Sequence, residues 1–256
     1  MFRRSRLIWP AVFACASAIS LHAMAAPDTI QATGGPITIQ PITHAAVQIK
    51  YGNQVITIDP TMMGGDYNAL PKADIILITD IHGDHLDAAT ITKASKGTTT
   101  VIVPGAASAQ VKGATVMANG ESKTINGVTI EAVPMYNLQR GPSAGQLFHT
   151  KGRGNGYIVT VGGKRLYFAG DTECIPEMKA LKNIDVAFVP MNLPYTMPPN
   201  EAAECVKAFK PTIVYPYHYR GTGATPEQNQ QAFVAAMKGT TGIEVRTPNF
   251  YPPAAK

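Results

Sequence analysis

Two histidines and two aspartates fall within six consecutive positions, at Asp80, His82, Asp84 and His85. Imidazole and carboxylate groups are common protein ligands for divalent metal ions. The four residues directly follow the apolar run 73–78, which is typical of a buried strand, and Gly83 lets the backbone turn tightly among them. The spacing therefore predicts a strand-end loop whose alternate side chains converge on a metal. A polar loop that caps a helix through Asp84 or Asp87 is the alternative, but a cap explains neither histidine.

Two further candidates occupy the same kind of position, where an apolar strand gives way to a loop. Asp171 follows the run Leu166-Tyr167-Phe168-Ala169, and His218 follows Ile213-Val214-Tyr215-Pro216-Tyr217. Each has an ordinary explanation as well, because Asp171 could cap the next helix and His218 could be a hydrogen-bonded core histidine. Together with the 80–85 cluster they indicate one site assembled from separate strand ends.

Apolar alternation and turn residues give the elements that must position these side chains. Segments near 37–39, 47–49 and 55–58 are typical of a hairpin meander, and strands and helices alternate after it. The later predicted strands cover 73–78, 99–103, 114–117, 127–133, 157–161, 165–169, 185–189, 212–217 and 243–246, and the predicted helices cover 87–95, 106–111, 175–181, 201–209 and 226–237. Residues 136–155 show no assignable pattern. This order predicts an α/β (α+β) fold in which two mixed sheets face each other with helices outside.

Residues 1–25 have the layout of a secretory signal peptide, so we expect one mature domain over 26–256. Three arginines precede an apolar run from Leu7 to Leu21, and Ala23-Met24-Ala25 supplies small residues before the cleavage point. An uncleaved membrane anchor is the alternative, but the run is short and Pro10 interrupts it. A lipoprotein site at Cys15 conflicts with the bulky residue two positions before it. We therefore expect a periplasmic or secreted protein with no stable membrane anchor after cleavage.

The composition is that of an ordinary globular protein, with 45% hydrophobic and 15% charged residues. Without residues 1–25 and their three arginines, the formal net charge falls from +5 to +2. No Lys/Arg cluster remains, so we expect a small-molecule substrate and no nucleic-acid partner. Cys174 and Cys205 could pair in an exported protein, or could be two buried thiols. The sequence leaves a homo-oligomer open.

The segment 79–85, the triplet Gly170-Asp171-Thr172 and His218 together resemble the signature of the metallo-β-lactamase-fold hydrolases, in that order and spacing. The resemblance covers essentially the whole chain after the leader. The segments around His44 and Asp59 also resemble the branch that includes ascorbate-6-phosphate lactonase and N-acyl-phosphatidylethanolamine phospholipase D. Membership would imply a four-layer αββα sandwich with one or two divalent metal ions at one edge. Zinc is the expected metal, with manganese or iron as alternatives.

The family pattern implies that Asp84, His85 and His218 bind one metal ion and that Asp171 bridges to another. A bound cation lowers the pKa of water from about 15.7 toward about 7 and polarises the substrate oxygen. The resemblance therefore implies hydrolysis by a metal-bound hydroxide, with Asp84 as the catalytic residue that also orients the water.

The other metal site departs from the family pattern. Asp80 stands where the first histidine of a His-x-His pair is expected, only His82 is retained, and Asn137 aligns with the third histidine. Carboxylate and amide ligands would weaken the preference for zinc and favour manganese, iron or magnesium. Alternatively, His149 folds back from the unassigned loop as a substitute ligand, instead of lying on the surface.

Five residues are expected around the metals without binding them. Asp59 is predicted to hydrogen-bond the motif loop, with a strand-terminating turn as its alternative. His44 is predicted to lie near the metals or to be structural. Tyr219 and Arg220, beside His218, and Arg153 are candidates for binding the substrate, although solvated surface is the ordinary reading of such cations.

We expect an exported metal-dependent hydrolase acting on an ester, a lactone or a phosphodiester. An Asp at position 171 resembles the lactonase, phosphodiesterase and thioesterase branches more than the true β-lactamases. A β-lactam hydrolase is nevertheless one alternative, a mononuclear iron dioxygenase is a second, and a catalytically silent metal-binding protein is a third. Gly141-Pro142-Ser143-Ala144-Gly145 has the letters of a Gly-x-Ser-x-Gly motif, but it lies in the unassigned segment 136–155 and not between a predicted strand and a helix, as a nucleophile elbow requires. The sequence contains no phosphate-binding Gly-x-x-x-x-Gly-Lys-Ser/Thr loop.

Overall fold

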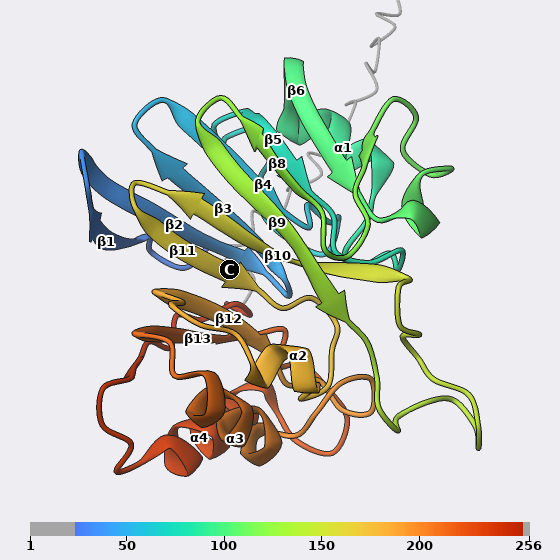
Figure 1. Ribbon diagram of the computed structural model, residues 1–256, viewed down its shortest axis with the longest axis vertical. Coiled ribbons are helices and arrows are strands. Elements are labelled where there is room, and N and C mark those ends of the chain that lie inside the picture. Colours follow the sequence, from blue (N-terminus) through green and yellow to red (C-terminus); the bar gives the residue numbers. More distant parts are fainter. Residues whose placement is uncertain (1–23, 253–256) are drawn as a thin grey trace, which may run out of the picture.

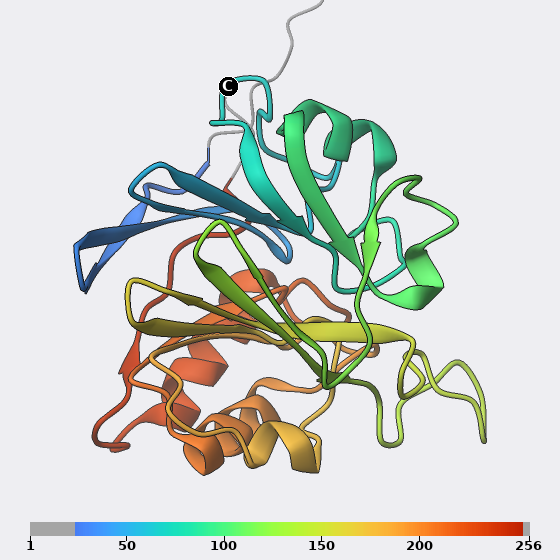
Figure 2. The ribbon, with the colours of Figure 1, turned by 45° about the horizontal axis from the view of Figure 1, so that its top comes forward.

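The computed structural model describes residues 24–252, so most of the predicted signal peptide at 1–25 lies outside the described residues. Two seven-stranded sheets stack face to face, with helices on their outer surfaces (Figures 1 and 2). This confirms the predicted four-layer αββα sandwich. In the described part of the chain, no helix has the length and apolar character that a membrane span requires.

The first sheet contains the strands β1 to β7 in chain order. The first four pair antiparallel and the last three add in parallel. The bounds are β1 (Asp28–Ala32), β2 (Gly35–Thr43), β3 (Ala46–Tyr51), β4 (Gln54–Ile58), β5 (Ala73–Leu77), β6 (Ser95–Val103) and β7 (Thr115–Val116). The helix α1 (Ala88–Ala94) begins at Asp87, whose carboxylate accepts a 2.7 Å hydrogen bond from the Thr90 backbone. Asp87 is therefore the cap, and Asp84 is free for the site.

The second sheet repeats this topology without a sequence repeat. Its first four strands pair antiparallel and its last three add in parallel. The bounds are β8 (Ser122–Ile125), β9 (Val128–Met135), β10 (Gly154–Val161), β11 (Lys164–Phe168), β12 (Val186–Pro190), β13 (Ile213–Tyr217) and β14 (Glu244–Val245). Its outer face is covered by α2 (Pro176–Lys179), α3 (Pro199–Phe209) and α4 (Pro226–Met237) (Figure 1).

One predicted helix needs correction, and two strands were not predicted. The predicted helix 106–111 is only the single 3-10 turn η1 (Gly105–Ala107), because the segment 108–114 continues as irregular turns. The strand predicted over 127–133 is the second arm of a hairpin whose first arm, β8, is exposed and polar and so has no apolar signal. The edge strand β1 was missed for the same reason, since only Ile30 is buried in it.

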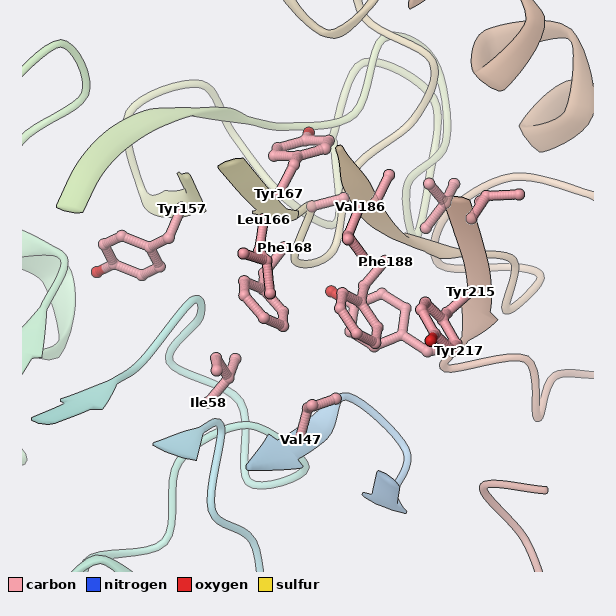
Figure 3. Close-up of a cluster of buried hydrophobic side chains, with 14 of the residues drawn as sticks. Val47, Ile58, Tyr157, Leu166, Tyr167, Phe168, Val186, Phe188, Tyr215 and Tyr217 are labelled. Carbon is pink, nitrogen blue, oxygen red and sulfur yellow. The ribbon is translucent and has the colours of Figure 1, made fainter. Parts of the chain in front are cut away.

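The main core lies between the two sheets, and a row of aromatic side chains on the second sheet forms one side of it (Figure 3). Phe168, Phe188 and Tyr215 are paired by strand register and stack with ring centroids 4.6 and 4.9 Å apart. Val47 and Ile58 face this row from the first sheet. The row makes three neighbouring strands into one rigid support, so the loops that leave their ends are held in place.

A disulfide joins Cys174 to Cys205 across 5.5 Å between their Cα atoms. The sequence left this pairing open. The bond ties the loop that follows Asp171 to the buried face of α3, on the side of the second sheet away from the first.

Candidate metal centre

Asp59, the first residue after β4, holds the loop 79–85 in place through hydrogen bonds. Its carboxylate accepts hydrogen bonds from the Thr79 backbone at 2.7 Å, from the Thr79 hydroxyl at 2.6 Å and from His85 Nδ1 at 2.8 Å. The side chain is fully buried. A carboxylate behind a metal-binding histidine fixes its tautomer and ring orientation. Asp59 therefore leaves His85 Nε2 as the nitrogen with a free lone pair, facing the interior of the site.

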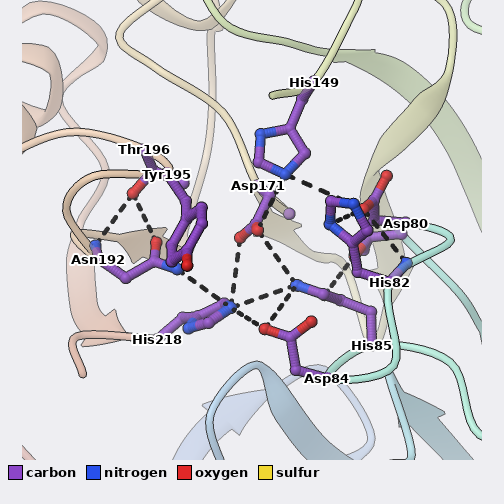
Figure 4. A network of polar contacts seen from close by, with 12 residues as sticks. Asp80, His82, Asp84, His85, His149, Asp171, Asn192, Tyr195, Thr196 and His218 are labelled. Atoms are coloured by element: carbon purple, nitrogen blue, oxygen red, sulfur yellow. Dashed lines mark hydrogen bonds and ion pairs between the residues drawn. The ribbon is translucent and has the colours of Figure 1, made fainter. Parts of the chain in front are cut away.

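Four predicted residues meet in one group, which we call the Asp84 cluster: Asp84, His85, Asp171 and His218 (Figure 4). His218 Nε2 lies 3.2 Å from Asp84 Oδ2, 3.4 Å from Asp171 Oδ1 and 3.2 Å from His85 Nε2. His85 Nε2 lies 3.4 Å from Asp171 Oδ2. Ligand atoms of a tetrahedral zinc ion are about 3.4 Å apart when its bonds are about 2.1 Å long. The residues of the cluster therefore fit a small divalent cation.

A second group, the Asp80 cluster, consists of Asp80, His82 and His149 on the other side of Asp171 (Figure 4). His82 Nδ1 lies 3.0 Å from Asp80 Oδ2, and His149 Nε2 lies 4.0 Å from the same oxygen. His149 Nε2 also lies 3.2 Å from Asp171 Oδ2, the oxygen that faces His85. Asp171 thus lies between the two clusters and has an oxygen within reach of each.

The structure distinguishes His149 from Asn137, the two candidates for the missing third ligand. His149 lies in the Asp80 cluster and is fully buried. Asn137 is hydrogen-bonded to His149, on the side of the ring away from the cluster. The Asn137 side-chain oxygen accepts from His149 Nδ1 at 2.7 Å, and its amide nitrogen donates to Glu173 and to the Tyr195 carbonyl. Asn137 therefore orients His149 much as Asp59 orients His85, and the placement of Asn137 as a ligand is corrected.

The hydrogen-bond partners also decide which nitrogens are free for a cation. An amide oxygen only accepts, so His149 Nδ1 carries the proton and Nε2 has the lone pair in the neutral ring. That lone pair faces an ionised carboxylate oxygen of Asp171 at 3.2 Å, with no hydrogen-bond partner. Asp171 Oδ1 is likewise buried without a donor. Buried acceptors that face each other need a positive charge between them, which either a proton on the imidazole or a metal ion provides.

The three aspartates are ionised at neutral pH although they are buried. Burial alone would raise the pKa of Asp171, but the charges of His218 and His85 hold it well below its ordinary value. Burial also opposes ionisation of Asp84, and the hydrogen bond from His218 lowers its pKa nonetheless. For Asp80 burial acts in the same direction, but the hydrogen bond with His82 and the neighbouring positive charges, including that of Arg153, together outweigh it and lower the pKa to about 2. The imidazoles that lower these pKa values as cations could instead bind a metal ion through their unprotonated nitrogens, so a metal ion would take the place of their protons.

The left-handed backbone at three strand ends positions this site. His44, Asp59 and His218 have φ values of 46°, 45° and 46°. Residues with a side chain adopt this region at a cost of about 1–3 kcal/mol, and such strain persists where the surroundings enforce it. His44 also lies near the metal candidates, since its ring is edge-on to His218 at 5.2 Å, but its Nδ1 is hydrogen-bonded to Tyr251 at 3.1 Å.

The three substrate-binding candidates make other contacts, and none is among the residues that line the pocket over the two clusters. Arg153 holds Asp80 with both Nε and Nη2, at 3.1 and 2.8 to 2.9 Å. The Tyr219 hydroxyl bonds the backbone of the segment 248–250. Arg220 stacks on the Tyr251 ring at 4.3 Å and lines a separate hollow. The role of these three residues in substrate binding therefore stays a prediction. Adjacency in sequence to His218 does not put Tyr219 or Arg220 in the pocket lining, because successive side chains after the strand point in different directions.

A pocket of about 350 Å³ opens over the two clusters and shows what sequence reasoning missed. It is lined by His82, Asp84, Phe148, Asp171, Asn192 and Tyr195. Asn192 follows the buried strand β12 by two positions, so the rule that selected Asp171 could have found it. Phe148 and Tyr195 lie on loops without a recognisable pattern, and no sequence signal pointed to them.

Comparison with known proteins agrees with this geometry. Residues 38–218 match the family model described as Beta-lactamase superfamily domain. A UPF0173 metal-dependent hydrolase of Pelotomaculum thermopropionicum is 31% identical over 214 residues, covering 79% of this chain and 92% of the relative. A crystal structure of a candidate metal-dependent hydrolase from Parabacteroides distasonis is 41% identical with a TM-score of 0.79, covering 88% of this chain and 98% of that one. A metallo hydrolase from Ignicoccus hospitalis, 23% identical with a TM-score of 0.65 over 86% of this chain and 96% of that one, shares the fold.

The family match and the assembled acidic and imidazole groups lead to one assignment. The chain belongs to the metallo-β-lactamase superfamily and, within it, to the UPF0173 family of metal-dependent hydrolases.

Proposed function

We propose that this chain is an exported hydrolase that holds two divalent metal ions and cleaves an ester, a lactone or a phosphodiester. The observation that carries the proposal is the position of Asp171, whose carboxylate has three imidazole nitrogens within 3.2–3.4 Å. One ion is held by the Asp84 cluster, and the other by the Asp80 cluster with Asp171 shared between them.

When bound, such ions lower the pKa of a water molecule and polarise the substrate oxygen. The protein residues do the rest. Asp84 is partly exposed to the pocket, with its side chain 31% accessible, and its ionised carboxylate can take the proton of the attacking water. That proton then passes to the leaving oxygen. Asp59 and Asn137 keep His85 and His149 in the tautomers that leave their Nε2 atoms free.

Zinc suits the Asp84 cluster, which offers two imidazoles and two carboxylates, with four of its atom pairs 3.2–3.4 Å apart. The Asp80 cluster has two imidazoles, and its carboxylate is shared with Arg153, so manganese or iron competes better there. A mononuclear iron dioxygenase needs one ion only, and the central position of Asp171 favours two. The narrower resemblance to the ascorbate-6-phosphate lactonase and N-acyl-phosphatidylethanolamine phospholipase D branch, like β-lactam hydrolysis, stays a prediction for substrate profiling.

Export and a periplasmic or secreted location are supported by the leader pattern and by the Cys174–Cys205 disulfide, because such bonds form in oxidising compartments. The test of location is fractionation of the native producer, with the chain expected in the periplasm or medium and shortened at its N-terminus. Recovery of the full-length chain from the cytosol would contradict this part of the proposal.

The hydrolase proposal is tested by a paired substitution. Asp84→Asn removes the proton acceptor and is expected to lower kcat by roughly 10²–10⁴-fold on p-nitrophenyl esters, lactones or bis(p-nitrophenyl) phosphate. Asp87→Asn removes a neighbouring carboxylate but keeps the cap of α1, so its activity is expected to match the wild type. Absence of turnover of the whole panel by fully metallated protein would contradict the proposal and favour a silent metal-binding protein.

A further inference from the structure

The pocket over the metal clusters has an aromatic wall. Phe148 and Tyr195 pack edge to face with their ring centroids 5.0 Å apart, and both line the pocket beside His82 and Asp84. Tyr195 is 45% exposed although it lines this pocket. Large apolar surface is left open to water at the mouth of this site, where an apolar part of a substrate would cover it.

The cations on the loop beside this wall are already neutralised. Arg153 is paired with Asp80 at 2.8 Å, and Lys151 with Glu177 at 2.5 Å. Arg140 is paired with Glu173 at 3.1 Å and with Glu201 at 2.8 Å. Among the described residues, the pocket lining contains no lysine or arginine. The lining therefore offers a phosphate no cationic side-chain partner, whereas an uncharged carbonyl group requires none.

The polar group that remains for a substrate is neutral. The Asn192 side-chain oxygen accepts from the Thr196 hydroxyl at 2.6 Å, which turns its amide nitrogen toward His218 Nε2 at 3.4 Å (Figure 4). A ligand bound to that histidine nitrogen would take away the only acceptor that the described residues offer this amide. The amide N–H is then free to donate to an uncharged oxygen in the pocket.

We propose that the pocket takes an uncharged carboxylic ester or lactone whose acyl group is apolar and packs against Phe148 and Tyr195. This rests on the proposed hydrolase function and narrows it, because it excludes phosphodiesters as the preferred class. The water oxygen forms a bond to the carbonyl carbon and the bond from that carbon to the alkoxy oxygen breaks. The water proton moves through Asp84 to the alkoxy oxygen, which leaves as the alcohol, and the acyl group leaves as the acid.

The experiment compares kcat/KM for p-nitrophenyl acetate, butyrate and hexanoate with that for bis(p-nitrophenyl) phosphate, using fully metallated wild-type protein. Each added methylene that packs on the wall is expected to raise kcat/KM by up to about fourfold, so hexanoate should exceed acetate by roughly 10²-fold. The phosphodiester is expected to react at least about 100-fold more slowly than hexanoate. A flat acyl-length profile, or faster turnover of the phosphodiester, would overturn the inference.

Substitutions of Phe148 and Tyr195 test whether the preference for longer acyl groups arises from the aromatic wall. Phe148→Ala and Tyr195→Ala are each expected to lower the hexanoate-to-acetate ratio by about tenfold with metal content unchanged, and Phe148→Leu and Tyr195→Phe should recover most of it. Val234→Ala removes an exposed apolar side chain on α4, outside the pocket lining, and is expected to leave the ratio as in the wild type. An unchanged ratio in both alanine variants would also overturn the inference.

The outcomes distinguish failure of the inferred substrate class from failure of the proposed hydrolase function. Faster turnover of the phosphodiester than of the hexanoate, with intact metal content, would reject the substrate class while the hydrolase function stands. Loss of all turnover in metal-replete wild-type protein would reject the hydrolase function, and this inference with it.

Discussion

The two clusters on either side of Asp171 are built from the same kinds of residue but are not equivalent. In the Asp84 cluster, four atom pairs between imidazole and carboxylate or imidazole and imidazole lie within 3.2–3.4 Å. In the Asp80 cluster His149 Nε2 is 4.0 Å from Asp80, and Arg153 binds both oxygens of that carboxylate. Among the described residues no arginine binds a carboxylate of the first cluster, whereas Arg153 already partly neutralises the second.

This difference teaches how one fold can hold two ions of unequal affinity. A carboxylate that is bound by a guanidinium has less charge to offer a metal, and an imidazole that must move costs binding free energy. Each cluster also has its own orienting residue, a carboxylate in Asp59 and an amide in Asn137. An amide polarises the imidazole less than a carboxylate does. The orienting residues, like the ligands, therefore favour tighter metal binding in the Asp84 cluster than in the Asp80 cluster.

The largest effect is expected from Asp171→Ala, because this carboxylate is common to both clusters. Both ions should be lost, and activity should fall by roughly 10³-fold or more, since metal activation of water contributes several kcal/mol. Elemental analysis of the purified variant, with Asp87→Asn as the control, measures the loss. Retention of either ion at full occupancy would show that the clusters do not share this residue.

A smaller effect that separates the clusters is expected from two histidine variants. His218→Ala should empty the Asp84 cluster and lower activity by roughly 10³-fold, whereas His149→Ala should remove only the weaker ion and lower activity by about 10–100-fold. Metal content and kcat are measured on the same preparations. The comparison fails if His149→Ala is the more damaging change.

The orienting residues are expected to give matched effects of about 10–100-fold in metal affinity. Asp59→Asn should weaken binding of the ion in the Asp84 cluster. An amide oxygen accepts the His85 Nδ1 proton less strongly than a carboxylate does, so the ring is oriented and polarised less. Asn137→Ala should weaken the other ion only. Competition with a chromogenic chelator measures both constants, and a loss of the same ion in both variants would contradict the assignment of one orienting residue to each cluster.

The smallest effect is expected when the weaker cluster is rebuilt. Asp80→His with Arg153→Gln introduces the missing imidazole and removes the cation that would otherwise lose its partner. Zinc affinity of this cluster should rise by about tenfold, because imidazole is a softer ligand than carboxylate. Isothermal titration with zinc tests this, and an unchanged constant would mean that Asp80 does not face the ion.

Much of the architecture was predictable because strand ends determine it. Apolar runs located β5, β11 and β13, and their last residues led to Asp171 and His218. The predicted bounds of α4 agree with the structure, since Pro226 and the Thr225 cap define its start. The topology of two mixed sheets followed from the order of the elements and is confirmed.

The missed features depend on contacts between distant segments. The choice between His149 and Asn137 is made by a hydrogen bond between two residues of one long loop. The pairing of Arg153 with Asp80 joins residues 73 positions apart, so it left no local signal. The left-handed conformation of His44, Asp59 and His218 likewise depends on their surroundings, because residues other than glycine rarely adopt it, although Asp and His are among those that do so most often.

Stepwise metal removal from the zinc-loaded wild-type protein tests the central claim most directly. We predict two zinc ions per chain that are released in two steps, at chelator concentrations at least about tenfold apart. The weaker step should be absent in His149→Ala and the stronger step absent in His218→Ala. Release of both ions in one step, or loss of the stronger step in His149→Ala, would contradict the account of two unequal clusters around Asp171.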